Sequence, residues 1–363
     1  MATALVVGGT GPTGHFVVNG LIARGFEVAI LHTGRHEVDE IPDSVEHIHT
    51  NPFAIDELNA AIADRTWDLV IATYGRLRAT AAAFVGKTGK FISVGGGPAY
   101  RGYMNADATY PTGMLVPVPE EAPKTRSEEE DGKGYRVLRS EEVVFDLHPD
   151  ASHFRYPYIY GKYQVVPREW PVVRRILDGR KELVLPDGGH YLNHHGAAAN
   201  MAHAVLLAVD HAGPAAGQIY NCGDERVLSL AQVVQVLCDA LEAKLEVVSM
   251  PYELAVSARP MVGQPWTSHR VFDLSKIKTQ LGYKDIVDPV EALKTVAVWL
   301  RDNPIGERGE RGLQDPFDYA AEDRLIANWR TAVASMSDPA FDRLPGFTGS
   351  YSGPGGSVRK SEW

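Results

Sequence analysis

The sequence predicts an α/β fold in which helices cover both faces of a doubly wound parallel sheet, with a smaller α/β lobe attached. Two observations support this prediction. In the first third of the chain, short apolar runs alternate with helical patterns, which is typical of parallel strands that are buried on both faces. The first apolar run also ends in a glycine-rich turn that leads directly into a helical pattern.

The expected elements of the first part follow in order. Strands are expected at 4–9, 27–33, 67–75 and 90–97, and helices at 14–25, 54–65 and 78–86. The segment 103–133 is polar, acidic and proline-containing, and we expect an exposed excursion, either near the mouth of a site or a solvated loop without a function.

The second part has a mixed pattern. Helices are expected at 135–147, 168–179 and 228–243, and strands at 153–161, 182–187, 218–224 and 245–251. We expect a dinucleotide-binding domain at 1–165, completed by parts of 190–225, and an interleaved substrate lobe at 166–302. Residues 303–363 are expected to hold a polar linker at 306–316, a helix with one apolar stripe, and a mobile Gly/Ser-rich tail from 346.

Composition limits the function. The chain of 363 residues carries 36 Lys and Arg against 46 Asp and Glu, a net charge of −10, which argues against a nucleic-acid partner. No apolar run approaches the ~18 residues of a membrane-spanning helix, and the N-terminus goes straight into a strand. We therefore expect a soluble, cytoplasmic protein. Cys222 and Cys238 lie in apolar contexts and are expected to be buried free thiols.

The turn "VVGGTGPTG" has glycines at positions 8, 11 and 14, between a strand and a helix. Gly8 permits a tight exit from the strand, Gly11 lets the backbone approach a pyrophosphate, and Gly14 lets the helix pack on the sheet. The N–H groups at the helix start then face the phosphates. The pattern therefore predicts a Rossmann-type dinucleotide site. The expected cofactor contacts in this part of the chain are Gly8, Thr10, Gly11, Pro12, Thr13, Gly14, His32, Thr33, Arg35, Asn51 and Thr73.

The residues after the second strand indicate which dinucleotide is preferred. That strand ends in His32 and Thr33, followed by Arg35, and no acid occurs before Glu37. A carboxylate here would hold the ribose 2′-hydroxyl of NAD, whereas a guanidinium suits the 2′-phosphate of NADP. We predict NADP(H) as the preferred cofactor, with NAD(H) possible; the alternative is that Arg35 points into solvent.

With the glycine turn and "YRVLRSEE" from Tyr135 together, the chain resembles the extended short-chain dehydrogenase/reductase family, the NAD-dependent epimerase/dehydratase group. "PVPEEAP" (117–123) and "FRYPYIYG" (154–161) resemble the segment before that family's catalytic tyrosine and its strand lining the nicotinamide. "HHGAAANMAHAV" (194–205) resembles the family's later H-V-D-D helix entry but lacks both acids. The likeness covers roughly residues 4–300.

The resemblance implies a catalytic pair at Tyr135 and Arg139, where the family has tyrosine and lysine. It also implies cofactor contacts from Tyr135, Arg139 and Tyr158. The family's serine position falls on Gly96, and Ser93 would point to the other face of its strand. A cation about 5 Å from the phenol contributes roughly 3 kcal/mol, or about two pKa units. Arginine can supply that field but cannot pass on a proton. The expected substrate contacts are Gly96, Gly97, Tyr100, Tyr160, Trp170 and His194.

Two further groups of side chains leave alternatives open. His190, His194 and His195 lack the spacing of a metal site, so we predict no metal and assign them a structural role or, for His194 or His195, a place near the substrate. Arg174, Arg175, Arg180 and Lys181 are either a solvated helix face or contacts to a substrate diphosphate.

The leading hypothesis is an NADP(H)-dependent oxidoreductase that interconverts a carbonyl and an alcohol on a small organic substrate, with Tyr135 as acid/base. The alternatives are an epimerase, dehydratase or lyase with a tightly held, transiently reduced cofactor, and a non-catalytic protein that senses a dinucleotide. A homodimer is expected from the resemblance alone.

Overall fold

A computed structural model describes residues 1–73, 76–263 and 268–336 of the chain. The chain divides into two units, Met1–Pro316 and Phe317–Trp363, and each is described by itself. The end of the strand predicted at 67–75 and the mobile tail predicted from 346 lie outside the described residues.

A seven-stranded sheet forms the centre of the first unit, in the order β10-β6-β5-β4-β1-β2-β3. All its strand pairs are parallel, as predicted. The strands are β1 (Thr3–Val7), β2 (Glu27–His32), β3 (Glu46–His49), β4 (Trp67–Ala72), β5 (Thr88–Gly96), β6 (Ser152–Tyr156) and β10 (Gln218–Asn221).

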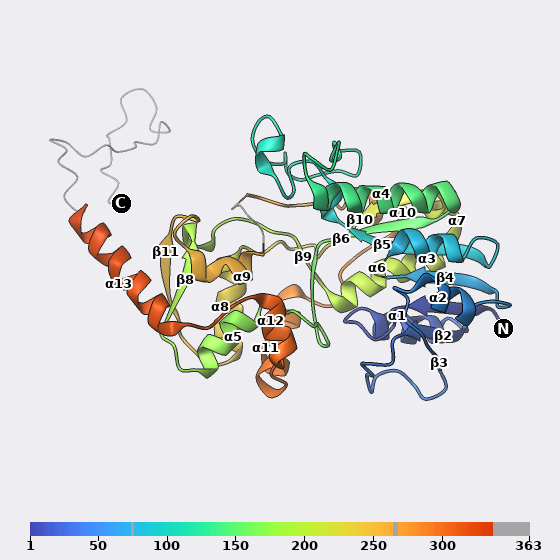
Figure 1. Ribbon diagram of the computed structural model, residues 1–363, viewed down its shortest axis with the longest axis horizontal. Coiled ribbons are helices and arrows are strands. Elements are labelled where there is room, and N and C mark those ends of the chain that lie inside the picture. Colours follow the sequence, from blue (N-terminus) through green and yellow to red (C-terminus); the bar gives the residue numbers. More distant parts are fainter. Residues whose placement is uncertain (74–75, 264–267, 337–363) are drawn as a thin grey trace, which may run out of the picture. The chain divides into compact units, whose positions relative to one another are not determined.

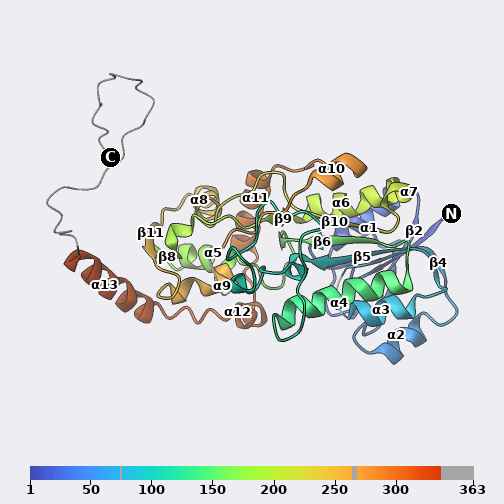
Figure 2. The ribbon, with the colours of Figure 1, turned by 90° about the horizontal axis from the view of Figure 1, so that it is seen from above.

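Helices cover both faces of this sheet, and Figure 2 shows the two helical layers on either side of the strands. One layer holds α1 (Gly14–Ala23), α6 (Ala198–Asp210), α7 (Ala212–Ala215) and α10 (Ser275–Leu281); the other holds α2 (Ile55–Ala61), α3 (Leu77–Ala83) and α4 (Gly132–Leu147).

Strand β1 illustrates how the apolar runs build two cores. Its side chains alternate between the faces, so Ala4 and Val6 join the core under α1 and α6, while Leu5 and Val7 join the core under α2, α3 and α4. All four side chains are buried. A strand that is buried on both faces must be apolar throughout, which is the pattern that predicted it.

The smaller lobe lies at the opposite end of the first unit from the N-terminus (Figure 1). Its two strands, β8 (Glu182–Pro186) and β11 (Glu246–Met250), pair in parallel. Its helices are α5 (Trp170–Leu177), α8 (Leu230–Ala240), α9 (Arg259–Val262), α11 (Pro289–Asp302) and α12 (Glu307–Leu313), with the short turns η3 (Asp187–Gly189) and η4 (Val256–Ala258).

Short elements connect the sheet to the lobe. Strand β7 (Tyr158–Tyr160) pairs with β9 (His195–Ala197), and the turns η1 (Gly97–Ala99) and η2 (Ala106–Ala108) follow β5. The strand predicted at 153–161 is thus divided into β6 and β7 at Pro157, which has no N–H to donate to a ladder.

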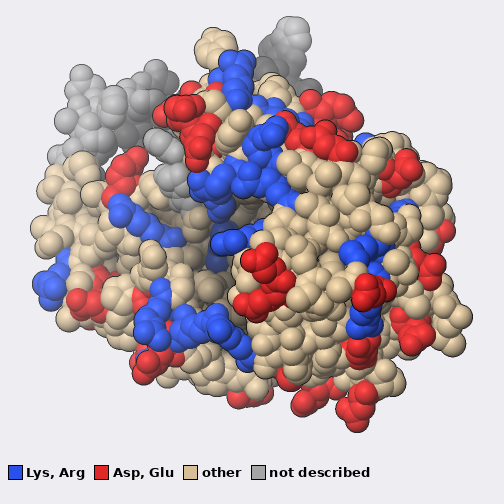
Figure 3. Space-filling view, turned by 45° about the vertical axis from the view of Figure 1, so that its right-hand side comes forward, with Lys and Arg blue, Asp and Glu red and all other residues tan. Residues whose placement is uncertain are grey.

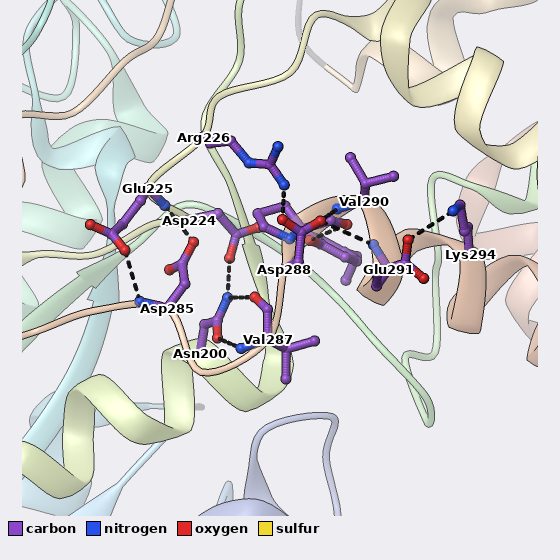
Figure 4. A network of polar contacts seen from close by, with 12 residues as sticks. Asn200, Asp224, Glu225, Arg226, Asp285, Val287, Asp288, Val290, Glu291 and Lys294 are labelled. Atoms are coloured by element: carbon purple, nitrogen blue, oxygen red, sulfur yellow. Dashed lines mark hydrogen bonds and ion pairs between the residues drawn. The ribbon is translucent and has the colours of Figure 1, made fainter.

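A polar network fixes the start of α6 against the segment before α11 (Figure 4). The Asp224 carboxylate accepts hydrogen bonds from the Ala197 N–H at 2.9 Å and from Asn200 Nδ2 at 2.8 Å. The Asn200 side chain also bonds the backbone of Val287 in both directions. The family that the sequence resembles has acids at this helix entry, and the segment 194–205 lacks them. Asp224, from a different part of the chain, places a carboxylate there.

Three sequence expectations are corrected. Strand β3 was missed because "EHIH" is polar and lies at the sheet edge. The polar linker expected at 306–316 contains helix α12, in which Gly309 and Gly312 approach the chain at Val165 and Val166 too closely for a side chain. In the lobe, Arg175 is buried against Asp315 at 2.8 Å rather than lying on a solvated face.

The cysteine prediction is confirmed, because Cys222 and Cys238 are both free and buried. None of the helices within the described ranges has the length and apolar character needed to cross a membrane. Helix α13 (Tyr319–Ser335) belongs to the second unit and carries the predicted stripe, in which Ile326 is buried and Val333 is exposed.

Candidate functional site

The candidate site lies where the parallel strands end. β1 lies between β2 and β4, so the chain winds outward in both directions from this point. In open α/β sheets, ligands bind in the crevice at the carboxyl ends of the strands at such a switch point. Gly8 follows β1, Thr33 follows β2, Thr73 follows β4 and Gly96 ends β5. The topology therefore brings these four predicted site residues to one edge.

The glycine turn at the end of β1 has the shape that a pyrophosphate requires. Gly8 has φ +96°, a conformation that favours glycine. A Cβ on Gly14 would lie 2.1 Å from the Gly9 carbonyl oxygen, so a side chain there is excluded. A Cβ on Gly11 would meet only the Gly8 carbonyl oxygen, at 3.9 Å. Gly8 and Gly14 therefore maintain the turn, whereas the surface of Gly11 is open.

The start of α1 completes this cradle. Thr13 precedes the helix and makes no side-chain capping bond, so no side chain competes for the first N–H groups of α1. These groups and the helix dipole favour an anion. The residues present thus fit the diphosphate of a dinucleotide, as the sequence predicted.

The other predicted cofactor residues differ in their surroundings. Thr10 and Thr13 are buried in the turn, and Thr73 Oγ1 donates to the Val7 carbonyl at 2.9 Å. Asn51 Oδ1 accepts from the Phe53 N–H at 3.1 Å. The Thr73 bond ties the end of β4 to the end of β1, whereas the Asn51 bond shapes its own turn after β3.

The chain after β2, where the sequence predicts contacts to the cofactor ribose, contains Thr33 and Arg35, which are both exposed. The nearest acid along the chain, Glu37, lies against His47 Nδ1 at 3.1 Å and His49 Nε2 at 3.3 Å. Its carboxylate is therefore engaged, while Arg35 makes no ion pair with any described residue.

A cavity of about 360 Å³ lies at the other end of the crevice. Its lining comes from the glycine turn, the end of β5, the excursion after it, the start of α4 and the chain from β6 to Arg168. The residues are Pro12, Gly95, Gly96, Pro98, Tyr103, Lys133, Tyr156, Pro157, Tyr158, Ile159, Gln164 and Arg168. Of the predicted site residues, Pro12, Gly96 and Tyr158 lie here, and the volume suits a small ligand.

The lining is basic. It includes Lys133 and Arg168 but no carboxylate. Figure 3 shows a hollow on one side of the molecule with Lys and Arg side chains gathered around it. The cavity therefore favours a ligand that carries negative charge.

Lys133, Gln164 and Arg168 are cavity residues that sequence reasoning missed. Lys133 lies in the first turn of α4, whose start is capped by the Asp131 carboxylate. Although Lys133 stays partly open to solvent, desolvation by the surrounding protein lowers its pKa, and the charge of Arg168 lowers it further against the opposing effect of Asp131. Such a lysine loses its proton more readily than an ordinary one.

The pair predicted from the resemblance lies elsewhere on the same helix. Neither Tyr135 nor Arg139 is among the cavity-lining residues. Positions two apart on a helix point about 200° apart, so Tyr135 faces away when Lys133 faces the cavity. Arg139, one turn further on, is paired with Glu142 of its own helix. The structure brings Tyr135 and Arg139 together on one face but does not bring that face to the cavity.

Tyr158, Gln164 and Arg168 form a fixed wall of the cavity. The Tyr158 hydroxyl accepts from Gln164 Nε2 at 2.9 Å and from the Arg168 N–H at 2.5 Å. The Arg168 guanidinium lies 4.1 Å from the centre of the Tyr158 ring. Arg168 Nη1 and Gln164 Oε1 are buried and make no hydrogen bond in the described structure. These two atoms therefore lack a hydrogen-bond partner among the described residues and are enclosed by the surrounding protein.

Glu169 lies behind this wall. Its carboxylate contacts the Tyr158 hydroxyl at 3.3 Å, and burial raises the pKa of Glu169 to about 7, against the lowering effects of its backbone hydrogen bond and of Arg168. An acid that titrates near neutral pH lies one residue away from Arg168 and in contact with a cavity tyrosine.

Most of the residues predicted to contact substrate are interior. Tyr160 donates to Asp224 at 2.8 Å, Trp170 donates to Glu310 at 3.0 Å, and His194 contacts the Asp224 carbonyl at 2.8 Å. Tyr100 donates to Asn221 at 2.6 Å. All four are almost fully buried, so we remove them from the proposed site.

Gly97 is corrected for a different reason. A Cβ there would lie 2.3 Å from the Phe272 ring, so this glycine allows ring packing rather than substrate access.

Ser93 points away from the cavity, as the strand register predicted. Its hydroxyl lies 2.7 Å from His153 Nδ1, and His153 Nε2 lies 3.5 Å from Glu141. Ser93 and His153 are both buried, and burial lowers the pKa of His153 to about 4. This serine-histidine-glutamate series is closed to solvent and has no access to a substrate.

Arg155 explains why the start of α4 is fixed in position. It forms a bidentate pair with Glu141 of α4 at 2.8 and 2.5 Å and donates to the Tyr100 hydroxyl at 2.8 Å. Burial alone would raise the pKa of Glu141, but the hydrogen bonds and charge of Arg155 lower it. The pair holds α4 on β6, with Lys133 at the cavity.

No family model matches the chain. An uncharacterised Escherichia coli K12 protein, YbjS, is 29% identical over 140 residues. That match covers 33% of this chain and 42% of the relative, so the chain spans less than half the length of the curated relative it matches.

Solved structures show similarity over most of the chain. A UDP-glucose 4-epimerase from Thermotoga maritima has a TM-score of 0.63 at 18% identity and covers 83% of this chain and 99% of its own. WbmH from Bordetella bronchiseptica, solved with NAD⁺, has 0.66 at 14% identity, covering 84% and 99%. A dTDP-glucose 4,6-dehydratase from Bacillus anthracis, solved with NAD, has 0.64 at 15% identity, covering 84% and 97%.

These neighbours belong to the group that the sequence resembles. The chain therefore has the fold of the extended short-chain dehydrogenases/reductases, and the resemblance is confirmed at the level of the fold.

Proposed function

We propose that the chain is an NADP(H)-dependent enzyme of the extended short-chain dehydrogenase/reductase type that interconverts a carbonyl and an alcohol on a small anionic substrate. The observation that carries the proposal is the cavity at the strand ends, where the glycine turn, the end of β5 and Lys133 meet. A bound nicotinamide would supply or accept the hydride at this place.

The preference for NADP(H) over NAD(H) rests on the ribose end. Arg35 is exposed and makes no ion pair with the described residues, and the carboxylate of Glu37 is engaged by histidines. A free guanidinium favours a 2′-phosphate. The NAD named in the titles of solved neighbours supports NAD(H) as the second choice.

The charge of the cavity supports the substrate class. Lys133 and Arg168 are part of the lining, which includes no carboxylate. A carboxylate or phosphate on the substrate would pair with these two cations and hold the reacting carbon beside Lys133.

For the proton transfer we propose Lys133. Lys133 lines the cavity, and because its pKa is lowered it gives up a proton more readily than an ordinary lysine. Tyr135 remains the prediction from the resemblance, and it requires a rearrangement of the start of α4 to reach the cavity.

Two variants separate these roles. A panel of aldehydes and ketones that carry a carboxylate or phosphate is screened by loss of NADPH absorbance. On the best substrate, Lys133→Met is expected to lower kcat by 10²-fold or more, whereas Tyr135→Phe retains most of it. Lys244→Met, on an exposed lysine of the lobe, controls for the loss of one charge. Full activity in Lys133→Met, with loss in Tyr135→Phe, would reverse the assignment.

An epimerase, dehydratase or lyase is the second candidate, because solved neighbours are named epimerases and a dehydratase. Cofactor that remains bound through purification, without net NADPH oxidation on any substrate, would favour it. Tight binding of NADPH without any turnover would favour the dinucleotide sensor. A cytoplasmic location and a homodimer remain predictions.

A further inference from the structure

Four side chains that can bind a metal ion converge at the edge of the large sheet. They are His32, Glu37, His47 and His49, which we call the histidine cluster. One ligand atom from each lies within 4.8 Å of all the others. The cluster is separate from the cavity, none of whose lining residues it shares.

The sheet register assembles the three imidazoles. His47 and His49 are two residues apart on β3, so their side chains lie on the same face. His32, at the end of β2, is the direct neighbour of His49 in the parallel pair β2–β3. The rings are steeply inclined to one another, with interplanar angles of 73°, 76° and 82°. They therefore converge edge to face, without stacking.

The turn after β2 brings in the fourth group. Gly34 has φ +69°, and a Cβ there would lie 3.2 Å from the His49 ring, so the turn packs closely on that imidazole. After this turn, the Glu37 carboxylate lies against all three rings. Its carboxylate lies 3.6 Å from His32, 3.1 Å from His47 and 3.3 Å from His49.

The separations are close to those of a known coordination geometry. Four ligands at the 2.0–2.2 Å bond lengths of zinc, arranged as a tetrahedron, lie about 3.3–3.6 Å apart. Glu37 Oε1 lies 3.6 Å from His32 Nε2 and 3.3 Å from His49 Nε2, and Glu37 Oε2 lies 3.1 Å from His47 Nδ1. His32 Nε2 and His47 Nδ1 are 3.2 Å apart, and all four ligand atoms lie within 4.8 Å of one another. Small side-chain rotations would therefore bring one oxygen and three nitrogens to the corners of a tetrahedron.

We propose that the histidine cluster binds one zinc ion, through His32 Nε2, His47 Nδ1, His49 Nε2 and a Glu37 oxygen. Three imidazoles and one carboxylate suit zinc among the common divalent ions, whereas Mg²⁺ and Ca²⁺ require mostly oxygen ligands. The proposal rests on the cluster alone and does not depend on the proposed function.

The exposure of the cluster gives an ion access from solvent, and the number of ligands indicates its role. The side chains of Glu37 and His49 are 49% and 56% exposed, whereas His32 is buried beneath them. Four protein ligands fill a tetrahedral shell, which indicates a structural rather than a catalytic ion. Zinc would tie the segment after β2 to β3. Because that segment carries Thr33 and Arg35, the ion would order the ribose end of the crevice.

The test uses the full-length chain without an affinity tag, stripped with a chelator and titrated calorimetrically with zinc chloride. We expect one zinc ion per chain. His49→Ala should weaken binding by about 100-fold or more, and His47→Ala/His49→Ala should abolish it. His36→Ala is the matched control, since His36 is an exposed neighbour outside the cluster, and it should bind zinc like the wild type.

Two further measurements separate a loss of zinc binding from a loss of folding. Circular dichroism establishes that the variants are folded, and Glu37→Gln, which preserves volume, should weaken zinc binding if the double variant is unfolded. Cobalt(II) should give the intense visible spectrum of a tetrahedral ion in the wild type and lose it in His49→Ala. No zinc binding by the wild type, or equal binding by the wild type and Glu37→Gln, would overturn the proposal. A second result would also overturn it: the wild type does not bind zinc, and His49→Ala lowers the affinity for NADPH. The cluster would then be a phosphate contact.

Discussion

Replacing Gly11 with alanine should separate the fold of the glycine turn from its ability to bind a dinucleotide. The new Cβ would meet only the Gly8 carbonyl oxygen, at 3.9 Å, and Gly11 does not have the positive φ of Gly8. The folded chain therefore accommodates the methyl group. The effect on the free energy of unfolding should be within about 1 kcal/mol, and it can be favourable because alanine restricts the unfolded chain.

The same methyl group would occupy the surface that a pyrophosphate must approach. We expect the affinity for NADPH to fall 10- to 100-fold, a loss of about 1.4–2.8 kcal/mol. Urea denaturation measures the stability and calorimetric titration measures the affinity on the same preparations.

Gly14→Ala is the contrasting variant. Its Cβ would lie 2.1 Å from the Gly9 carbonyl oxygen, so it should destabilise the fold itself by several kcal/mol. Unchanged NADPH affinity in a folded Gly11→Ala protein would refute the assignment of this turn as the pyrophosphate cradle.

Three further variants test the surroundings of the site. Arg35→Ala should lower the affinity for NADPH about tenfold and leave that for NADH unchanged; equal effects on both in titration would remove the 2′-phosphate role. Since the pKa of buried Glu169 is raised to about 7, the wild type loses stability as pH rises from about 4.5 to 7. Glu169→Gln cannot ionise, so its free energy of unfolding should rise by about 3 kcal/mol relative to that of the wild type between pH 4 and pH 8. Urea denaturation at each pH measures this, and a constant difference between the two proteins would contradict it. Glu141→Gln should cost about 3–5 kcal/mol by leaving Arg155 as an unpaired buried cation; a thermal midpoint like that of the wild type would show that the pair does not hold α4.

The sequence predicts the parts of the fold whose cause is local. The glycine turn is recognisable because its strand, glycines and helix are contiguous, and β1 is recognisable because burial on both faces demands an unbroken apolar run. Strand β3 escapes because its four residues, "EHIH", are polar at an edge of the sheet. The histidine cluster depends on that strand, so it is invisible until the register of β2 and β3 is known.

The candidate site is less predictable because it depends on which way side chains face. The motif favours Tyr135 over Lys133, although only the orientation of α4, fixed by Arg155 and Glu141, decides which one reaches the cavity. Tyr160 and Trp170 look equally suited to a substrate pocket and to a core. Long-range partners, Asp224 and Glu310, place both of them in the interior.

The central claim is that the crevice at the strand ends binds a nicotinamide dinucleotide. Its most direct test is calorimetric titration of the purified chain with NADPH and with NADH, after absorbance has shown whether cofactor is already bound. We predict either one NADPH bound per chain, more tightly than NADH, or a dinucleotide that is retained through purification. A folded protein that carries no dinucleotide and binds neither one would contradict the claim.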